Sequence, residues 1–321
     1  MIEVQHLTKK YGKHLALDDL SFTIEKGQIY GFLGPNGAGK STTMNIMTGY
    51  ISATSGEVLI DGHSILDEPE KAKKSIGYLP EIPPLYLDMT VMEYLKFVAE
   101  LKKIPKDKRP AEVRKASTLV KLNDVSNRLI RNLSKGYKQR TGLAAAVLGF
   151  PDIIILDEPT VGLDPKQIIE IRQLIRKLAK DHTVILSSHI LAEVQEICDY
   201  ILIISKGKLV GSGTPEELEE LSHGKDSIEL TVKSDADTIQ SVLDRIDGIQ
   251  NVTWRNQGAG SCDLLVDTSK SAQEVCEDIS IAFATERIPV TRINILKATL
   301  EDIFLELTES SQKDEEGETK R

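Results

Sequence analysis

The chain has 321 residues, of which 40% are hydrophobic and 28% are charged. This mixture is typical of a globular protein and excludes a disordered or fibrous one. The 40 Lys and Arg are outnumbered by 49 Asp and Glu, so the formal charge of −9 offers no overall positive field to attract nucleic acid. At about 150 residues per domain, the length predicts two domains.

Secretion, membrane insertion and cysteine chemistry are also disfavoured. Residues 1–5 contain no basic region followed by an apolar stretch, and no uncharged apolar run approaches the ~18 residues of a spanning helix. Cys198, Cys262 and Cys276 lie far apart and form no CxxC pair, which argues against a disulfide framework and a zinc site. We therefore expect a chain that is not exported, does not cross a membrane and works in a reducing compartment.

A glycine-rich loop follows the first strands. Residues 2–33 alternate polar and apolar positions and predict antiparallel strands that lead into a buried strand at 28–33. The next segment fits the P-loop pattern GxxxxGK[ST], in which backbone N–H groups converge on phosphate oxygens at the start of a helix. The expected phosphate-binding residues are Gly34, Pro35, Asn36, Gly37, Ala38, Gly39, Lys40, Ser41 and Thr42. Lys40 would neutralise the β- and γ-phosphates, and the Ser41 hydroxyl would bind Mg²⁺.

A second candidate anion site lies further along the chain. The pattern becomes helical from Thr90, which forms a capping box with Glu93. Beyond 131, Ser134 is an N-cap residue with Gly136 two positions on, and the free N–H groups of such a helix start attract anions. One chain with two phosphate-binding ends can hold a nucleotide between two copies. Taken alone, a serine and a glycine before a helix are more often an ordinary cap.

Two adjacent carboxylates end a predicted parallel strand. Residues 153–156 form a continuous apolar run, as expected of a strand covered on both faces, and Asp157 and Glu158 follow it. Ligands of open α/β sheets bind beyond the carboxyl ends of the strands, where adjacent residues point to opposite faces. Asp157 would therefore bind Mg²⁺, and Glu158 would polarise the water that attacks the γ-phosphate. Two solvated acids are the alternative.

The remaining pattern completes the predicted architecture. Helix 165–178 and the buried strand 184–186 continue the alternation, which predicts a mainly parallel α/β sheet with antiparallel and helical subdomains, the helical one at about 88–150. Beyond 222, strands and helices in the order β-α-β-β-α-β and a final helix at 300–307 predict an α+β domain of ferredoxin-like type. We expect domains at 1–221 and 222–308 and a disordered charged tail at 309–321.

Taken as a set, these motifs resemble the ATP-binding subunits of ABC transporters over residues 2–220. The segments that carry the resemblance are the P-loop, the helix start at 134–136, Asp157-Glu158-Pro159-Thr160, Gly162-Leu163-Asp164 and Ser188-His189. The resemblance implies a P-loop NTPase fold of ABC type. It also implies that Glu158 is the catalytic carboxylate, with catalytic Lys40 in the P-loop, and that His189 contacts the γ-phosphate.

The resemblance assigns further residues to the nucleotide. Tyr11 matches the aromatic residue that stacks on adenine, although packing against the strands is a serious alternative for it. Ser134 and Gly136 would face ATP held by the P-loop of the other subunit, and Asp164 would lie at the seam between subunits. Glu81 stands where the family usually has a glutamine and can still bind Mg²⁺ or its water.

Two departures narrow the family assignment. Glu81 is one, and the other is Leu-Ser-Lys-Gly-Tyr at 133–137 in place of the family's Leu-Ser-Gly-Gly-Gln. Together with the C-terminal extension, they resemble the subgroup of prokaryotic ATPases paired with export permeases for antibiotics, sodium and gliding motility.

The function implied is that of an ATPase that dimerises on Mg-ATP, with itself or with a paralogous cassette. It would power a separate integral-membrane permease, an exporter, from the cytoplasmic face of the membrane. A soluble ABC-type ATPase acting on ribosomes or DNA is the alternative, but one P-loop, no heptad run and an acidic charge disfavour it and a nucleic-acid partner. A P-loop kinase is a further alternative. It is disfavoured because phosphoryl transfer to another substrate would not need the Ser134 helix start or His189.

Overall fold

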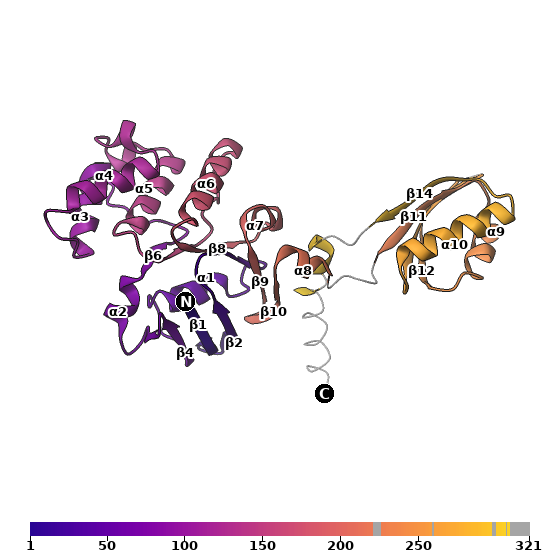
Figure 1. Cartoon of the computed structure of the whole chain (residues 1–321), viewed down its shortest axis with the longest axis horizontal. Helices are drawn as coiled ribbons and strands as arrows, with labels where there is room; N and C mark the ends of the chain where they lie inside the picture. The colour runs from indigo at the N-terminus through magenta and orange to yellow at the C-terminus, as the bar shows by residue number, and fades with distance from the viewer. Residues whose placement is uncertain (221–225, 259, 297–299, 306, 309–321) are drawn as a thin grey trace. The chain divides into compact units, whose positions relative to one another are not determined.

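The computed structural model describes residues 1–220, 226–258, 260–296, 300–305 and 307–308. The predicted disordered tail at 309–321 and the predicted domain limits at 221 and 222 lie outside these ranges. The chain divides into two compact units, one built on Met1–Pro215 and one on the described part of Glu216–Glu306 (Figure 1). None of the helices in the described ranges has the length and hydrophobicity needed to span a bilayer.

A six-stranded, mainly parallel sheet forms the centre of the first unit. Its strands, in the order β10-β9-β3-β8-β7-β6, are β10 (Lys208–Gly213), β9 (Tyr200–Ser205), β3 (Ile29–Leu33), β8 (Thr183–Ser188), β7 (Ile153–Leu156) and β6 (Ile76–Leu79). All pairings are parallel except that of β10 with β9. Every residue of β3, β7 and β8 is buried, in agreement with the buried strands predicted at 28–33, 153–156 and 184–186.

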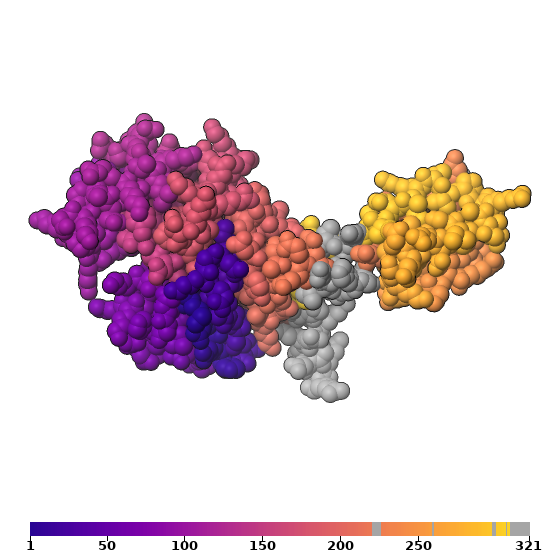
Figure 2. All heavy atoms as spheres, in the orientation of Figure 1, coloured from indigo at the N-terminus to yellow at the C-terminus, as the bar shows by residue number. Residues whose placement is uncertain are grey.

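An antiparallel sheet packs against this centre. Its order is β2-β1-β4-β5, formed by β2 (His14–Ile24), β1 (Ile2–Tyr11), β4 (Ser55–Ile60) and β5 (His63–Ser64). Phe22 of this sheet meets Phe32 of the parallel sheet edge-on, with 5.3 Å between the ring centroids. Helix α1 (Lys40–Met47) buries Met44 and Met47 in the same core. The outer residues of β1 and β2 lie on the surface of the unit (indigo in Figure 2).

Helices complete the first unit. They are α2 (Pro69–Lys74), α3 (Val91–Leu101), α4 (Arg109–Leu119), α5 (Lys135–Val147), α6 (Pro165–Leu178) and α7 (Leu191–Ile197), with 3-10 turns at Asn123–Val125 and Ile130–Asn132. Helices α3, α4 and α5 gather in one group (Figure 1), which lies within the predicted helical subdomain. The capping box of Thr90 and Glu93 is confirmed, since each side chain accepts the backbone N–H of the other residue.

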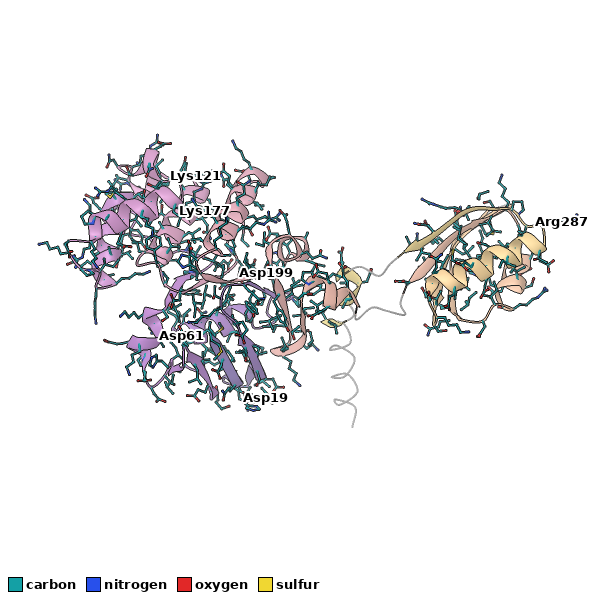
Figure 3. The ribbon with its side chains drawn as sticks, viewed as in Figure 1. Asp19, Asp61, Lys121, Lys177, Asp199 and Arg287 are labelled. Atoms are coloured by element: carbon teal, nitrogen blue, oxygen red, sulfur yellow. The ribbon has the colours of Figure 1, made fainter. Side chains whose placement is uncertain are left out.

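The strand that leads into the glycine loop is anchored at its start. The Asp199 side chain (labelled in Figure 3) accepts a hydrogen bond from the backbone N–H of Ile29 at 2.7 Å. The backbone N–H of Asp199 in turn donates to the Ile29 carbonyl at 2.8 Å. These bonds tie the beginning of β3 to the segment that enters β9, so the end of β3 is placed at a fixed position along the sheet edge.

The second unit has its own antiparallel sheet and core. Its elements are α8 (Pro215–Glu220), β11 (Ser227–Val232), α9 (Ala236–Leu243), β12 (Ile249–Gly258), β13 (Ser261–Thr268), α10 (Ala272–Thr285) and β14 (Val290–Leu296). The sheet order is β12-β13-β11-β14. Ile239 of α9 and Phe283 of α10 are buried against alternate residues of the strands. The β-α-β-β-α-β order agrees with the sequence analysis, and the ferredoxin-like type remains a prediction.

Candidate active site

The glycine loop connects β3 to α1 and requires glycine for steric reasons. Gly39 is the N-cap of α1 and has φ +108°, a backbone conformation that residues with side chains rarely adopt. A Cβ at Gly39 would lie 2.6 Å from Leu17 and 2.9 Å from the carbonyl oxygen of Ala16. A Cβ at Gly34 would lie 2.2 Å from the carbonyl oxygen of Ile204. The loop is therefore closely packed against β2 and β9, and no side chain caps the start of α1.

Lys40 turns its ammonium group back into this loop. Its Nζ donates to the carbonyl oxygens of Gly34 at 2.7 Å and Pro35 at 3.2 Å, and it lies 3.7 Å from Oε1 of Glu158. Burial lowers the pKa of Lys40, while the nearby carboxylates of Glu158 and Asp157 raise it and reduce the shift. A positive charge is therefore held where an anion bound to the loop would meet it.

Asp157 lies where the parallel strands end. Its Oδ1 accepts hydrogen bonds from the hydroxyl of Ser41 at 3.0 Å and from that of Ser187 at 2.6 Å. Ser41 and Asp157 are far apart in the sequence, but both follow the carboxyl ends of strands in one parallel sheet. The sheet therefore brings the predicted metal-binding hydroxyl and carboxylate together, as the strand-end argument anticipated.

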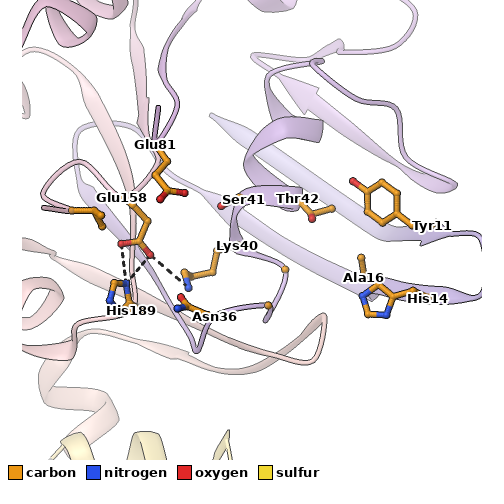
Figure 4. A pocket seen from close by; sticks show the side chains of 13 residues that line it. Tyr11, His14, Ala16, Asn36, Lys40, Ser41, Thr42, Glu81, Glu158 and His189 are labelled. Carbon is orange, nitrogen blue, oxygen red and sulfur yellow. Dashed lines mark hydrogen bonds and ion pairs between the residues drawn. The ribbon is translucent and has the colours of Figure 1, made fainter. Parts of the chain in front are cut away.

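Glu158 interacts with two cationic or proton-donating side chains. Both of its carboxylate oxygens lie 3.1 Å from Nδ1 of His189, and Oε1 also contacts Lys40 (dashed in Figure 4). Because an ionised carboxylate only accepts hydrogen bonds, we assign a proton to Nδ1 of His189 in this arrangement. Glu158 has φ +46°, a rare backbone conformation for a residue with a side chain.

Most of the predicted site residues line a single cavity of about 480 Å³ (Figure 4). The predicted residues that line it are Tyr11, Asn36, Gly37, Gly39, Lys40, Ser41, Thr42, Glu81, Glu158 and His189. Gly34, Pro35 and Ala38 belong to the same loop, and Asp157 adjoins the cavity through Ser41. Tyr11 is 48% exposed and Lys9 Nζ lies 5.1 Å from its ring centroid, so Tyr11 is not a core residue.

Ser134, Gly136 and Asp164 form a separate group that does not line this cavity. The hydroxyl of Ser134 accepts from the Tyr137 N–H at 3.4 Å and starts α5, as predicted. The Asp164 side chain accepts from the Gln167 N–H at 2.9 Å and starts α6. A Cβ at Gly136 would lie 2.4 Å from the Gln167 side chain, so the two helix starts are adjacent.

Four residues of this region were not predicted from the sequence. One of them is Ala16, which lies in β2 and lines the cavity. His14 lines the cavity because it pairs with Tyr11 across the tight turn between β1 and β2, a position that the three-residue spacing could have indicated. Val161 also lines it, directly after the Glu-Pro-Thr segment. Ser187 directly follows the predicted strand 184–186 and was given no role. Its contacts with Asp157 depend on the pairing of β7 with β8, which the sequence does not specify.

Comparison with known proteins identifies the family. The ABC transporter family model matches residues 17–161. YhcH of Bacillus subtilis (strain 168), an uncharacterized ABC transporter ATP-binding protein, is 34% identical over an alignment that covers 100% of this chain and 97% of YhcH. The linearmycin resistance ATP-binding protein LnrL of the same organism is 31% identical, with 98% and 100% covered. The bacitracin transport ATP-binding protein BcrA of Bacillus licheniformis is 41% identical, with 65% and 68% covered.

Solved structures agree. An ATP-binding subunit of an ABC transporter has a TM-score of 0.64 and 29% identity, and the match covers 70% of this chain and 93% of that one. A dimeric bacterial ABC transporter cassette has a TM-score of 0.62 and 28% identity, with 67% and 98% covered. The same cassette has been solved in a post-hydrolysis state bound to ADP and Pi, and that chain is 27% identical to this one. This chain therefore belongs to the ABC transporter ATP-binding proteins and is an ATPase subunit of that family.

Proposed function

We propose that two copies of this chain, or one copy and a paralogous cassette, close on two Mg-ATP and thereby drive a separate membrane permease. The separation of the two phosphate-binding ends carries this proposal. Lys40 and the glycine loop line one cavity, whereas Ser134 and Gly136 lie outside it. A second chain would place its own Ser134 helix start opposite the loop, and a similar cassette is described as dimeric.

The nucleotide would bind by its phosphates first. Backbone N–H groups at the start of α1 would meet the phosphate oxygens, and Lys40 would exchange its loop carbonyls for the β- and γ-phosphates. Tyr11 is 48% exposed and lines the same cavity, where adenine could stack on its ring. Asp164 would contact the second subunit at the seam.

The residues that meet at Asp157 fit Mg²⁺. Hydroxyl and carboxylate oxygens are the ligands that this ion prefers, and the Ser41 hydroxyl and Asp157 carboxylate already lie 3.0 Å apart. Glu81 lines the same cavity and adds a third oxygen donor, directly or through water. When bound, the ion would supply charge neutralisation between the phosphates. Ser41, Asp157 and Glu81 would hold it.

Hydrolysis would depend on Glu158. Its carboxylate would polarise the attacking water, and most of the acceleration would come from positioning and from charge stabilisation by Lys40. The His189 ring lies 3.1 Å from the Glu158 carboxylate oxygens and would turn to the γ-phosphate when ATP binds.

The partner and location follow from the relatives. The names of BcrA and LnrL refer to bacitracin transport and linearmycin resistance, which supports export as the direction. We place the chain peripherally at the cytoplasmic face of the membrane, bound to an integral-membrane permease. The cassette would span 1–221 and an accessory domain 222–308.

Dimerisation tests the proposal. Glu158→Gln chains, which should bind ATP without consuming it, are expected to double their mass from 35.5 kDa in light scattering when Mg-ATP is added. Adding Ser134→Arg should abolish this dimer, because the new side chain would occupy the γ-phosphate contact. Asp235→Arg, at the exposed N-cap of α9, is the matched control and should leave the dimer intact. A Ser134→Arg chain that still dimerises would contradict the proposal. A Glu158→Gln chain that stays monomeric would exclude the pair of identical copies and leave the pair with a paralogous cassette.

A further inference from the structure

Ser187 lies at the carboxyl end of β8 and is completely buried. Its hydroxyl donates to Oδ1 of Asp157 at 2.6 Å and accepts from the backbone N–H of Glu158 at 2.8 Å. A single hydroxyl therefore contacts the side chain of one functional carboxylate residue and the backbone of the next. Ser187 has no part in the function proposed for this site.

The backbone contact replaces a missing sheet hydrogen bond. The ladder between β7 and β8 ends at the pair Leu156 and Leu186. The N–H of Asp157 turns to the other neighbour and donates to the Leu79 carbonyl at 2.8 Å. The N–H of Glu158 faces β8, where the Ser187 side chain accepts it in place of a carbonyl. The rare φ of +46° at Glu158 is thus held by a specific bond, as strained positions require.

The side-chain contact orients the carboxylate of Asp157. Oδ1 accepts hydrogen bonds from the hydroxyls of Ser41 and Ser187, while Oδ2 accepts no hydrogen bond from the described residues. Oδ2 is therefore available to a cation or its water. If the Ser41 oxygen turned to that cation, Ser187 would remain as the hydroxyl donor that fixes the Asp157 carboxylate.

We propose that Ser187 is a positioning residue for both the metal-binding Asp157 and the base Glu158, so that one hydroxyl sets the distance between the metal and the attacking water. The inference rests on the proposed function of these two residues. Losing the hydroxyl would leave the Glu158 N–H without its acceptor and would let the Asp157 carboxylate rotate. Hydrolysis and metal affinity should therefore fall together, while contacts of the nucleotide with the glycine loop remain.

The test compares Ser187→Ala with Thr183→Val in the full chain. Thr183 lies at the opposite end of β8 and is also a buried hydroxyl that accepts a backbone N–H, that of Gly27 at 3.0 Å. For Ser187→Ala we expect kcat to fall about 10-fold or more, the scale of a lost bond to a charged group, with KM for ATP little changed. Mn²⁺ can be titrated into the nucleotide complex and followed by electron paramagnetic resonance. The Mn²⁺ concentration at half-saturation should be about fivefold higher or more for Ser187→Ala than for the unmodified chain.

The controls separate positioning from folding. Both variants should bind ATP normally in EDTA, and Thr183→Val should keep the kcat and the Mn²⁺ half-saturation of the unmodified chain. Unchanged kcat and Mn²⁺ affinity in Ser187→Ala would overturn the inference. If Ser187→Ala loses binding in EDTA, Ser187→Cys, a similar shape with a weaker donor, decides: an intermediate kcat supports the inference and the same loss of binding overturns it. An unmodified chain that binds no Mn²⁺ with nucleotide would instead contradict the proposed metal site.

Discussion

Replacing Glu158 by glutamine removes the proposed base while keeping its shape. The amide can still lie beside His189 Nδ1, 3.1 Å from the present carboxylate oxygens, but it cannot take a proton from water. We expect kcat to fall about 10²- to 10⁴-fold, the range in which a positioned general base contributes. This corresponds to about 3 to 5.5 kcal/mol in the activation free energy.

The same change should leave ATP binding intact or strengthen it. Oε1 of Glu158 lies 3.7 Å from Lys40 Nζ, and both side chains are less than a tenth exposed. At an effective dielectric of about 20, this separation gives a Coulomb attraction of about 4 to 5 kcal/mol, which a triphosphate must replace when it draws Lys40 toward itself. Without the carboxylate charge, Lys40 would have to give up only its hydrogen bonds to the loop carbonyls of Gly34 and Pro35.

Phosphate release measures the turnover, and fluorescence of a bound nucleotide analogue measures the affinity. Glu158→Asp provides the control, because it keeps the charge but withdraws the carboxylate by one methylene, and we expect an intermediate kcat. A Glu158→Gln chain that hydrolyses ATP within threefold of the unmodified rate would refute the assignment of Glu158. A loss of ATP binding equal to the loss of turnover would show that the residue serves binding instead.

Three further predictions follow from the structure. Lys40→Ala should weaken nucleotide binding and turnover together, in the same two assays, because its cation lies at the loop carbonyls, where it would meet the phosphates. Hydrogen bonds from Thr90 hold the pKa of Glu93 below its usual value, so Glu93→Gln should lower the melting temperature at pH 7, and the difference should vanish as the pH falls through that depressed pKa. Burial raises the pKa of Cys198 and shields it, so alkylation followed by mass spectrometry should label the half-buried Cys276 first. Preferential labelling of Cys198, or a pH-independent Glu93→Gln effect, would contradict these arguments.

The phosphate loop was predictable because its signal is local. Strand, glycine loop and helix are consecutive in the sequence. A glycine marks a position where a positive φ is allowed, and Gly39 indeed has φ +108°. The meeting of Ser41 with Asp157 was predictable from a general rule, since carboxyl ends of parallel strands share one sheet edge. The N-caps Ser134 and Asp164 were likewise readable from residue type and spacing.

The remainder of the site depends on which strands become neighbours. Ser187 contacts Asp157 only because β8 pairs with β7. The alternation of strands and helices in the sequence does not predict which strands pair. The insertion of β4 beside β1 is of the same kind, because β4 follows the glycine loop in sequence but joins the N-terminal sheet. The positive φ of Glu158 could not be predicted from the sequence either. No glycine marks this position, and the conformation is held by the hydrogen bond from the Glu158 N–H to Ser187.

The most direct test of the shared-nucleotide account is a crystal structure of the Glu158→Gln chain grown with ATP and Mg²⁺. We expect a pair of chains in which the Ser134 hydroxyl of one lies within hydrogen-bond distance of a γ-phosphate oxygen held by Lys40 of the other. A nucleotide bound wholly within one chain, with Ser134 and Gly136 facing solvent, would contradict it.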